Sequence, residues 1–147
     1  MNLNRKYLKN ISIIVLILAG IFLINLVRGI FFDGLNQAAI PEGAPENTLQ
    51  ITQIFMLVMS LLFLLPQIYV GVKGLKIANV PDASKGHIVW ASILLATAAW
   101  GVASGLFSMI GDGVTFGSIF DIAVVAVETV VYWVYIKFAR AIYQAEQ

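Results

Sequence analysis

The sequence predicts an all-α integral membrane protein, a bundle of four membrane-spanning helices that forms one domain over residues 1–147. Three observations predict this fold: four long apolar stretches, a low content of charged residues, and a one-sided distribution of lysine and arginine. Hydrophobic residues make up 60% of the chain and charged residues only 12%, whereas a soluble domain carries about 25% charged residues. Lipid is therefore the solvent that suits most of the surface of this protein.

The four apolar stretches are each long enough to cross the hydrocarbon core of a bilayer, which takes about 20 residues in a helix. We expect the spans at about 11–32, 49–72, 88–110 and 115–137. The first stretch is longer than the apolar part of a signal peptide, so we interpret it as a span. The stretches lack the alternation of membrane strands, and four strands could not close a barrel.

Positive charge lies almost entirely on one side of the predicted bundle. Only Arg28 lies near the other side; the remaining lysine and arginine residues are Arg5, Lys6, Lys9, Lys73, Lys76, Lys85, Lys137 and Arg140. Cytoplasmic loops of membrane proteins are enriched in these residues. The rule places the N-terminus, the 73–85 loop and the C-terminus in the cytoplasm. We expect a multi-pass protein of the cytoplasmic (inner) membrane, in contact with the lipid bilayer.

Glu128 is the most informative residue, because it lies near the middle of the fourth span. An acid at this depth costs about 2.5–3.5 kcal/mol on insertion scales, so it must face protein or water. Asp121, Tyr132 and Tyr135 share its helical face at spacings of seven and four residues. The stripe predicts an ion or proton path with Glu128 as the titrating site. The alternative is that Glu128 only fixes helix packing through a hydrogen bond.

Other polar residues within the spans support two further expectations. Arg28 and Asp121 have similar predicted depths, so they either form an ion pair or Arg28 extends alone to the outer headgroups. The second span carries its own polar face, formed by Gln53, Ser60 and Gln67 at seven-residue spacing. This face is suited to hydrogen bonds between helices or, alternatively, to the lining of a permeation path.

The third span is rich in small residues. Gly101 and Gly105 form a small-xxx-small pair, which favours close helix packing. Trp100 has a similar depth to Glu128, so its indole N–H either donates to that carboxyl group or the ring faces lipid or the core. At the start of this helix we expect Ser84 as the N-cap and His87 as a solvated residue at the membrane surface, with a pH-sensing role for His87 as the alternative.

Three short resemblances to known proteins add little about activity. The Lys-Gly-Leu-Lys motif at 73–76 and the Ser-Lys-Gly-His motif at 84–87, together with the four spans, resemble uncharacterised small four-span membrane proteins of bacteria. The Pro66-Gln67 dipeptide resembles the PQ-loop motif of small sugar and amino-acid transporters, which are built from three-helix units. The size is similar to that of small multidrug resistance transporters. Their essential glutamate lies on the first helix, which here has none.

The composition limits the function classes. Cysteine is absent and histidine occurs once, so thiol chemistry, disulfides and a multi-histidine metal site within one chain are excluded. We expect no cofactor and no metal, no nucleic-acid partner and no enzymatic activity, because no nucleophile and base occur together. We expect an oligomeric channel or transporter for protons or small cations that uses Glu128. The alternative is a non-catalytic accessory or scaffold subunit of a membrane complex. Four helices hardly shield two acids, so a homo-oligomer or a larger complex is expected.

Overall fold

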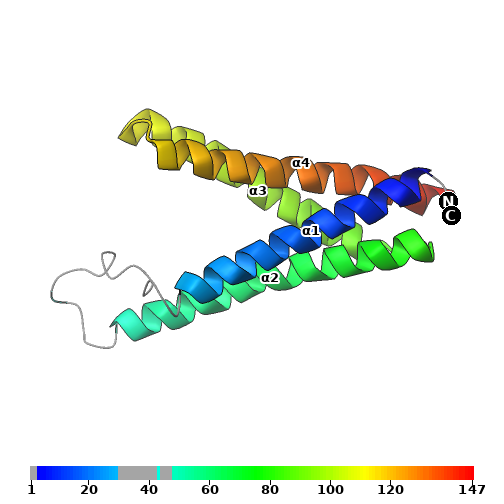
Figure 1. Ribbon diagram of the computed structural model, residues 1–147, viewed down its shortest axis with the longest axis horizontal. Helices are drawn as coiled ribbons and strands as arrows, with labels where there is room; N and C mark the ends of the chain where they lie inside the picture. The colour runs from blue at the N-terminus through cyan, green and yellow to red at the C-terminus, as the bar shows by residue number, and fades with distance from the viewer. Residues whose placement is uncertain (1–2, 30–42, 44–47) are drawn as a thin grey trace.

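The computed structural model describes residues 3–29, residue 43 and residues 48–147, and within these it contains four helices. They are α1 (Leu3–Arg28), α2 (Thr48–Asn79), α3 (Gly86–Asp112) and α4 (Phe116–Ala145) (Figure 1). Each is long and apolar enough to cross a membrane. The predicted all-α fold with four apolar helices is therefore confirmed. Residues 30–32, the end of the first expected span, lie outside the described residues.

Three of the helices extend well beyond the expected spans. The first begins at Leu3 rather than near residue 11, the second continues to Asn79, and the fourth continues to Ala145. The expected bounds were placed where charged residues begin. Charge ends the apolar part of a helix but not the helix itself, because lysine and arginine are good helix formers. The second helix stops just before Pro81, which cannot donate to a helical hydrogen bond.

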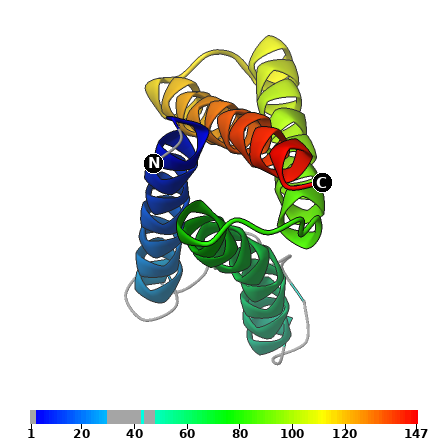
Figure 2. The same cartoon turned by 90° about the vertical axis from the view of Figure 1, so that its right-hand side faces the viewer.

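The helices form two antiparallel pairs. Helix α1 packs mainly on α2, and α3 packs mainly on α4. The two pairs cross at the end of the molecule that carries the N-terminus, the C-terminus and the loop of residues 80–85, here called the terminal end (Figures 1 and 2). Away from it the pairs spread apart, and the opposite end is here called the open end. The molecule is therefore closed at one end and divided at the other.

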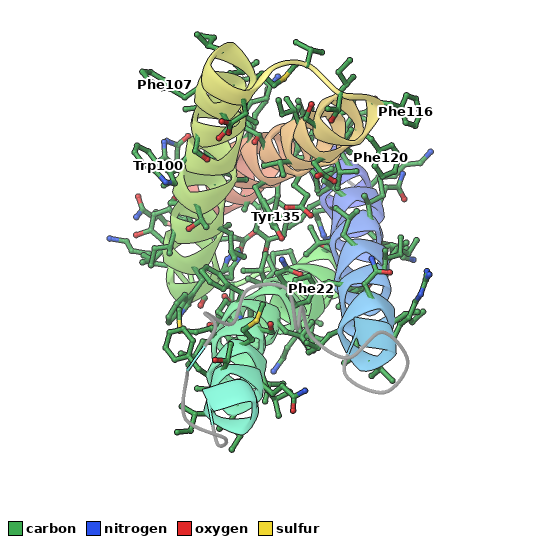
Figure 3. The ribbon with its side chains drawn as sticks, turned by 90° about the vertical axis from the view of Figure 1, so that its left-hand side faces the viewer. Phe22, Trp100, Phe107, Phe116, Phe120 and Tyr135 are labelled. Carbon is green, nitrogen blue, oxygen red and sulfur yellow. The ribbon has the colours of Figure 1, made fainter. Side chains whose placement is uncertain are left out.

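The buried core lies in the half of the molecule near the terminal end. It contains residues from all four helices, among them Leu8, Val15, Val70, Ile77, Ala91, Leu94, Tyr132, Tyr135 and Ala139. Toward the open end the described side chains are not buried: Trp100 is 74% exposed, Phe107 79% and Phe116 86%. Figure 3, viewed from the open end, shows these three rings on the outside of the α3–α4 pair. Such apolar surface is suited to lipid or to a partner.

Glycines on α2 allow three helices to meet at one level. A methyl group added to Gly74 would touch Ser12 Oγ of α1 and would lie 2.7 Å from Tyr135 Cε2 of α4. One added to Gly71 would lie 2.6 Å from Leu16 Cδ2. Small residues are common where membrane helices approach closely, because the gain comes from packing of the backbones. These two glycines therefore determine where α2 crosses its neighbours.

The predicted small-residue pair on α3 faces α4. A methyl group on Gly101 would lie 2.9 Å from Val125 Cγ1, and one on Gly105 would lie 2.8 Å from Ile122 Cγ1. Helix α4 begins with a capping box in which Thr115 Oγ1 accepts from the Ser118 N–H at 3.1 Å. The turn and the close packing hold α3 and α4 together where no other described helix covers them.

The expected N-cap of α3 is wrong. The cap position is Lys85, which makes no side-chain capping hydrogen bond. The Ser84 N–H instead donates to Asp82 Oδ1 at 2.8 Å, because an aspartate two residues earlier can form a local turn of this kind. This hydrogen bond of Ser84 closes a turn within the 80–85 loop.

Candidate functional site

A cavity of about 510 Å³ lies between the two helix pairs. All four helices line it, with Phe22 on α1 and segments within 55–67 on α2, 94–101 on α3 and 125–132 on α4. Several lining residues also belong to the buried core, so the core forms the side of the cavity that faces the terminal end. The volume is within the range of about 300–1,000 Å³ that is usual for small-molecule sites.

Polar side chains from opposite helix pairs meet in this cavity. Helix α4 contributes Glu128 and Tyr132, one turn apart, and helix α2 contributes Ser60 and Gln67. Thr97 of α3 also lines the cavity, but its hydroxyl donates to the Ile93 carbonyl oxygen at 2.9 Å. Much of the polar stripe expected on α2 and of that expected on α4 thus faces one shared space.

Two oxygen atoms at this site are buried without a hydrogen-bond partner. They are Gln67 Oε1 and Tyr132 Oη, on side chains that are 8% and 1% exposed. Within the described part of the chain, the half-buried Glu128 makes no hydrogen bond or ion pair either. A buried polar group without a partner costs about 1–3 kcal/mol. Such groups usually indicate a missing water, ion or ligand.

The remaining walls of the cavity are apolar and rich in soft side chains. Phe22 lies on the α1 side, and Figure 3 shows it near the space between the two helix pairs. Phe55, Met56, Met59 and Phe63 line the α2 side. Methionine adapts to irregular shapes and aromatic rings offer flat faces with negative potential. The cavity therefore combines one acidic group with a large apolar surface.

Several predicted site residues lie outside this cavity. Asp121 is exposed, nearly two turns from Glu128 toward the open end, and Gln53 and Tyr135 do not line the cavity. Arg28 and Asp121 are both exposed, and no ion pair joins these two described residues. The helix pairs spread apart at the open end, which separates groups that similar depth alone would place together.

Trp100 faces away from Glu128. Its ring is 74% exposed and lies on the outer side of α3 (Figure 3). Of the two expectations for this residue, donation to the Glu128 carboxyl is wrong, and an outward-facing ring is what the structure contains. Trp100 is one residue before Gly101, and Gly101 lies on the face that packs against α4. Successive residues are about 100° apart on a helix, so Trp100 is turned away from the face that Gly101 presents to α4.

A second polar cluster lies at the terminal end. His87 is 1% exposed, and its Nδ1 is 2.6 Å from Tyr135 Oη while its Nε2 is 3.1 Å from the Ser84 carbonyl oxygen. The Tyr135 hydroxyl also donates to the Val70 carbonyl oxygen at 3.0 Å. The expectation of a solvated His87 is therefore wrong. Tyr135, on another helix and 48 residues away, covers the ring.

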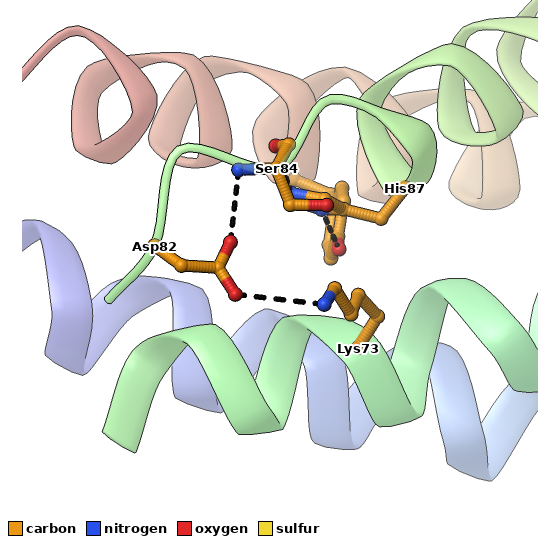
Figure 4. Close-up of polar contacts among 5 residues, drawn as sticks. Lys73, Asp82, Ser84 and His87 are labelled. Atoms are coloured by element: carbon orange, nitrogen blue, oxygen red, sulfur yellow. Dashed lines mark hydrogen bonds and ion pairs between the residues drawn. The ribbon is translucent and has the colours of Figure 1, made fainter. Parts of the chain in front are cut away.

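An ion pair between Lys73 of α2 and Asp82 of the 80–85 loop lies beside this cluster (Figure 4). Lys73 Nζ is 3.5 Å from Asp82 Oδ2, and Asp82 Oδ1 accepts from the Ser84 N–H. The Ser84 N–H first, and then the positive charge of Lys73, lower the pKa of the Asp82 carboxyl from its ordinary value of 3.8. The turn is the one that the Pro-Asp-Ala-Ser segment at 81–84 predicts.

The described residues contain no group of three or more His, Cys, Asp or Glu side chains that could hold a metal ion. The site thus offers one carboxyl group in a partly open, mostly apolar cavity, which two further oxygen acceptors also border. Comparison with protein-family models, with curated proteins and with solved structures finds no match to this chain.

Proposed function

We propose that this protein is a membrane transporter in which Glu128 binds a proton or a small cation inside the cavity between the two helix pairs. One observation carries the proposal: a carboxyl group and two buried oxygen atoms without partners, from α2 and α4, border the same cavity. Acidic residues within membrane-spanning segments commonly mark ion paths and proton relays. A purely structural acid would be expected to have a hydrogen-bond partner in the protein.

The arrangement of the core favours a carrier over an open channel. The excess of lysine and arginine supports a cytoplasmic terminal end. Between that end and the cavity lie the buried residues Val15, Val70 and Tyr135. In this orientation the cavity is sealed from the cytoplasm, and the space between the spread helix pairs is on the other side. Rocking of one pair against the other is the usual way to expose such a site alternately.

The alternative function is a non-catalytic subunit of a membrane complex. The observation that favours it is the apolar surface near the open end, where Ile110 is 84% exposed and Phe116 86%. A second copy of the chain or a different membrane protein could cover this surface. In that case the polar groups of the cavity would be completed by the partner.

A flux measurement separates the two functions. The purified protein is reconstituted into liposomes, and uptake of protons or monovalent cations is followed with internal dyes under an imposed gradient. We expect a saturable flux for the wild type that depends on pH. Glu128→Gln keeps the size of the side chain but cannot titrate, so its flux should fall at least about tenfold and lose its pH dependence.

The matched control is Glu146→Gln, which removes an exposed carboxyl group just after the same helix, outside the cavity, and should leave the flux unchanged. Folding of each variant is checked by helical circular dichroism and by size-exclusion chromatography. Absence of flux from folded wild-type protein would contradict the transport proposal and favour the subunit of a complex.

A further inference from the structure

We infer that the ligand of the cavity is a protonated amine with an apolar body, which competes with a proton for Glu128. The inference rests on the transport function proposed above and names the chemical class of its substrate. It is carried by three properties of the cavity: its volume, its set of oxygen acceptors and its apolar walls.

The cavity is larger and more apolar than a bare cation or a proton requires. A proton needs one carboxyl group and a chain of water, and a metal ion needs oxygen ligands on several sides. Here about 510 Å³ is lined mainly by carbon, with a few polar groups on α2, α3 and α4. Organic ligands occupy sites of this kind, with a few polar groups that orient an otherwise apolar molecule.

The polar atoms match an ammonium group. Gln67 Oε1 accepts hydrogen bonds, as does Tyr132 Oη through its lone pairs, and both are buried without a partner. The Glu128 carboxylate adds a third acceptor and the negative charge. An ammonium group has three N–H donors and no acceptor. One ammonium group therefore has enough donors for all three of these side chains, which lie on α2 and α4.

The charge of the cavity excludes the opposite ligand class. Glu128 is the only acidic side chain among the described lining residues, and no Lys, Arg or His lies with it. On its own helix the titratable neighbour is Tyr132; the facing residues Gln67 and Ser60 on α2, Thr97 on α3 and Phe22 on α1 carry no charge. An anion would find no positive charge among these residues and would be repelled by the Glu128 carboxylate. Carboxylate charge close to aromatic faces instead favours an organic cation.

The apolar walls account for the body of the ligand. Phe55 and Phe63 of α2 present rings, and Met56 and Met59 present flexible thioether chains. Together they suit an aryl or alkyl group of variable shape. A sugar is a poorer fit, because it needs donors and acceptors around its whole ring, whereas most of the residues that line this cavity are apolar.

Binding and protonation are then linked through one carboxyl group. When Glu128 is protonated, entry of the ammonium ion expels one proton to water, and the charge of the cavity is conserved. The affinity for the amine should therefore fall by about tenfold per pH unit once the pH is below the titration of Glu128. The same competition would couple movement of amine in one direction to movement of a proton in the other.

Binding is measured by calorimetry with the purified full chain in lipid nanodiscs, using four matched probes. They are 4-phenylbutylamine, its N,N,N-trimethyl derivative, the neutral 4-phenylbutanol and the anionic 4-phenylbutyrate. We expect the amine to bind best. The trimethyl derivative should bind more weakly because it has no N–H donor for Gln67 and Tyr132, the alcohol should bind at least about tenfold more weakly, and the anion should not bind.

Two variants test the roles of individual residues. Glu128→Gln should lower the affinity for the amine at least about tenfold and remove its pH dependence. Gln67→Leu should weaken binding of the amine but not of the trimethyl derivative, a difference that a merely structural role would not produce. Glu146→Gln is the control that should bind all four probes like the wild type.

The results distinguish this inference from the function on which it rests. Equal affinity for alcohol and amine would overturn the inference and indicate a pocket for any apolar molecule, such as a lipid chain. Proton flux in liposomes without amine binding would overturn the substrate class and leave the proposed function standing. Amine binding that depends on Glu128, without any flux, would support the ligand site and contradict transport.

Discussion

His87 Nδ1 lies 2.6 Å from Tyr135 Oη, which joins the first turn of α3 to the core half of α4. The Tyr135 hydroxyl donates in turn to the Val70 carbonyl oxygen of α2, and the His87 Nε2 lies within hydrogen-bond distance of the Ser84 carbonyl oxygen. A neutral imidazole has one N–H donor, so when Nε2–H donates to the Ser84 carbonyl oxygen, the Tyr135 hydroxyl is the donor toward either His87 Nδ1 or the Val70 carbonyl oxygen. The cluster connects three helices between the terminal end and the cavity.

Tyr135→Phe should destabilise the protein by about 1–3 kcal/mol, because it leaves the buried His87 Nδ1 without a partner. The side-chain ring, and hence the packing of the core, is retained. Thermal unfolding of the purified protein in detergent, followed by circular dichroism, measures the effect. The control Tyr7→Phe changes a side chain that is 43% exposed and should shift stability by less than about 0.5 kcal/mol. Equal effects of the two substitutions would contradict the role of the His87–Tyr135 contact.

Gly74→Ala should also destabilise the protein, by about 1–3 kcal/mol. The added methyl group would meet Ser12 Oγ and the Tyr135 ring, both of which belong to buried residues. Gly20→Ala is the matched control, because a methyl group there has no atom within 4 Å; alanine favours a helix, so this change should be neutral or stabilising. Comparison of the two melting temperatures checks the prediction, and a stable Gly74→Ala protein would refute the close crossing at this level.

The Asp82 carboxyl should make a small contribution to stability that depends on pH. Its pKa is lowered in the folded protein by the Ser84 N–H and by Lys73. The contribution is therefore present above the unfolded value and is lost as the pH falls through the folded pKa. The side chain of Asp82 is 45% exposed, so its contribution to the free energy of unfolding should stay below about 1 kcal/mol. The melting temperatures of the wild type and of Asp82→Asn, measured between pH 7 and pH 3, should converge as the pH falls. A difference that stays constant over this range would contradict the predicted contribution of Asp82.

The absence of cysteine makes the orientation directly testable. Single cysteines are introduced at Ala83 in the 80–85 loop and at Val114 between α3 and α4, both of which are exposed. If the terminal end is cytoplasmic, a membrane-impermeant maleimide added to intact bacterial cells should label the Val114→Cys variant alone. Both variants should react after the cells are opened. Labelling of Ala83→Cys in intact cells would reverse the proposed orientation.

Local composition allowed the helices and several site residues to be predicted. The four apolar stretches and the position of Glu128 within the fourth can be read from the chain, as can the polar faces that contain Gln67 and Tyr132. The prediction was less accurate at the helix ends, where charged flanks continue the helices beyond the apolar stretches. It was wrong for His87, because burial of this residue depends on Tyr135 of another helix.

The sequence by itself determined that four helices form and that lipid suits their surfaces, because transfer energies and backbone hydrogen bonds add up within each helix. Only the tertiary structure decided which polar residues meet. Gln67 and Glu128 share a cavity while Asp121 stays outside it, since the helix pairs cross near the terminal end and spread beyond it. The crossing depends on close approaches such as that of Ser12 and Tyr135 to Gly74, and these three residues are far apart in the chain.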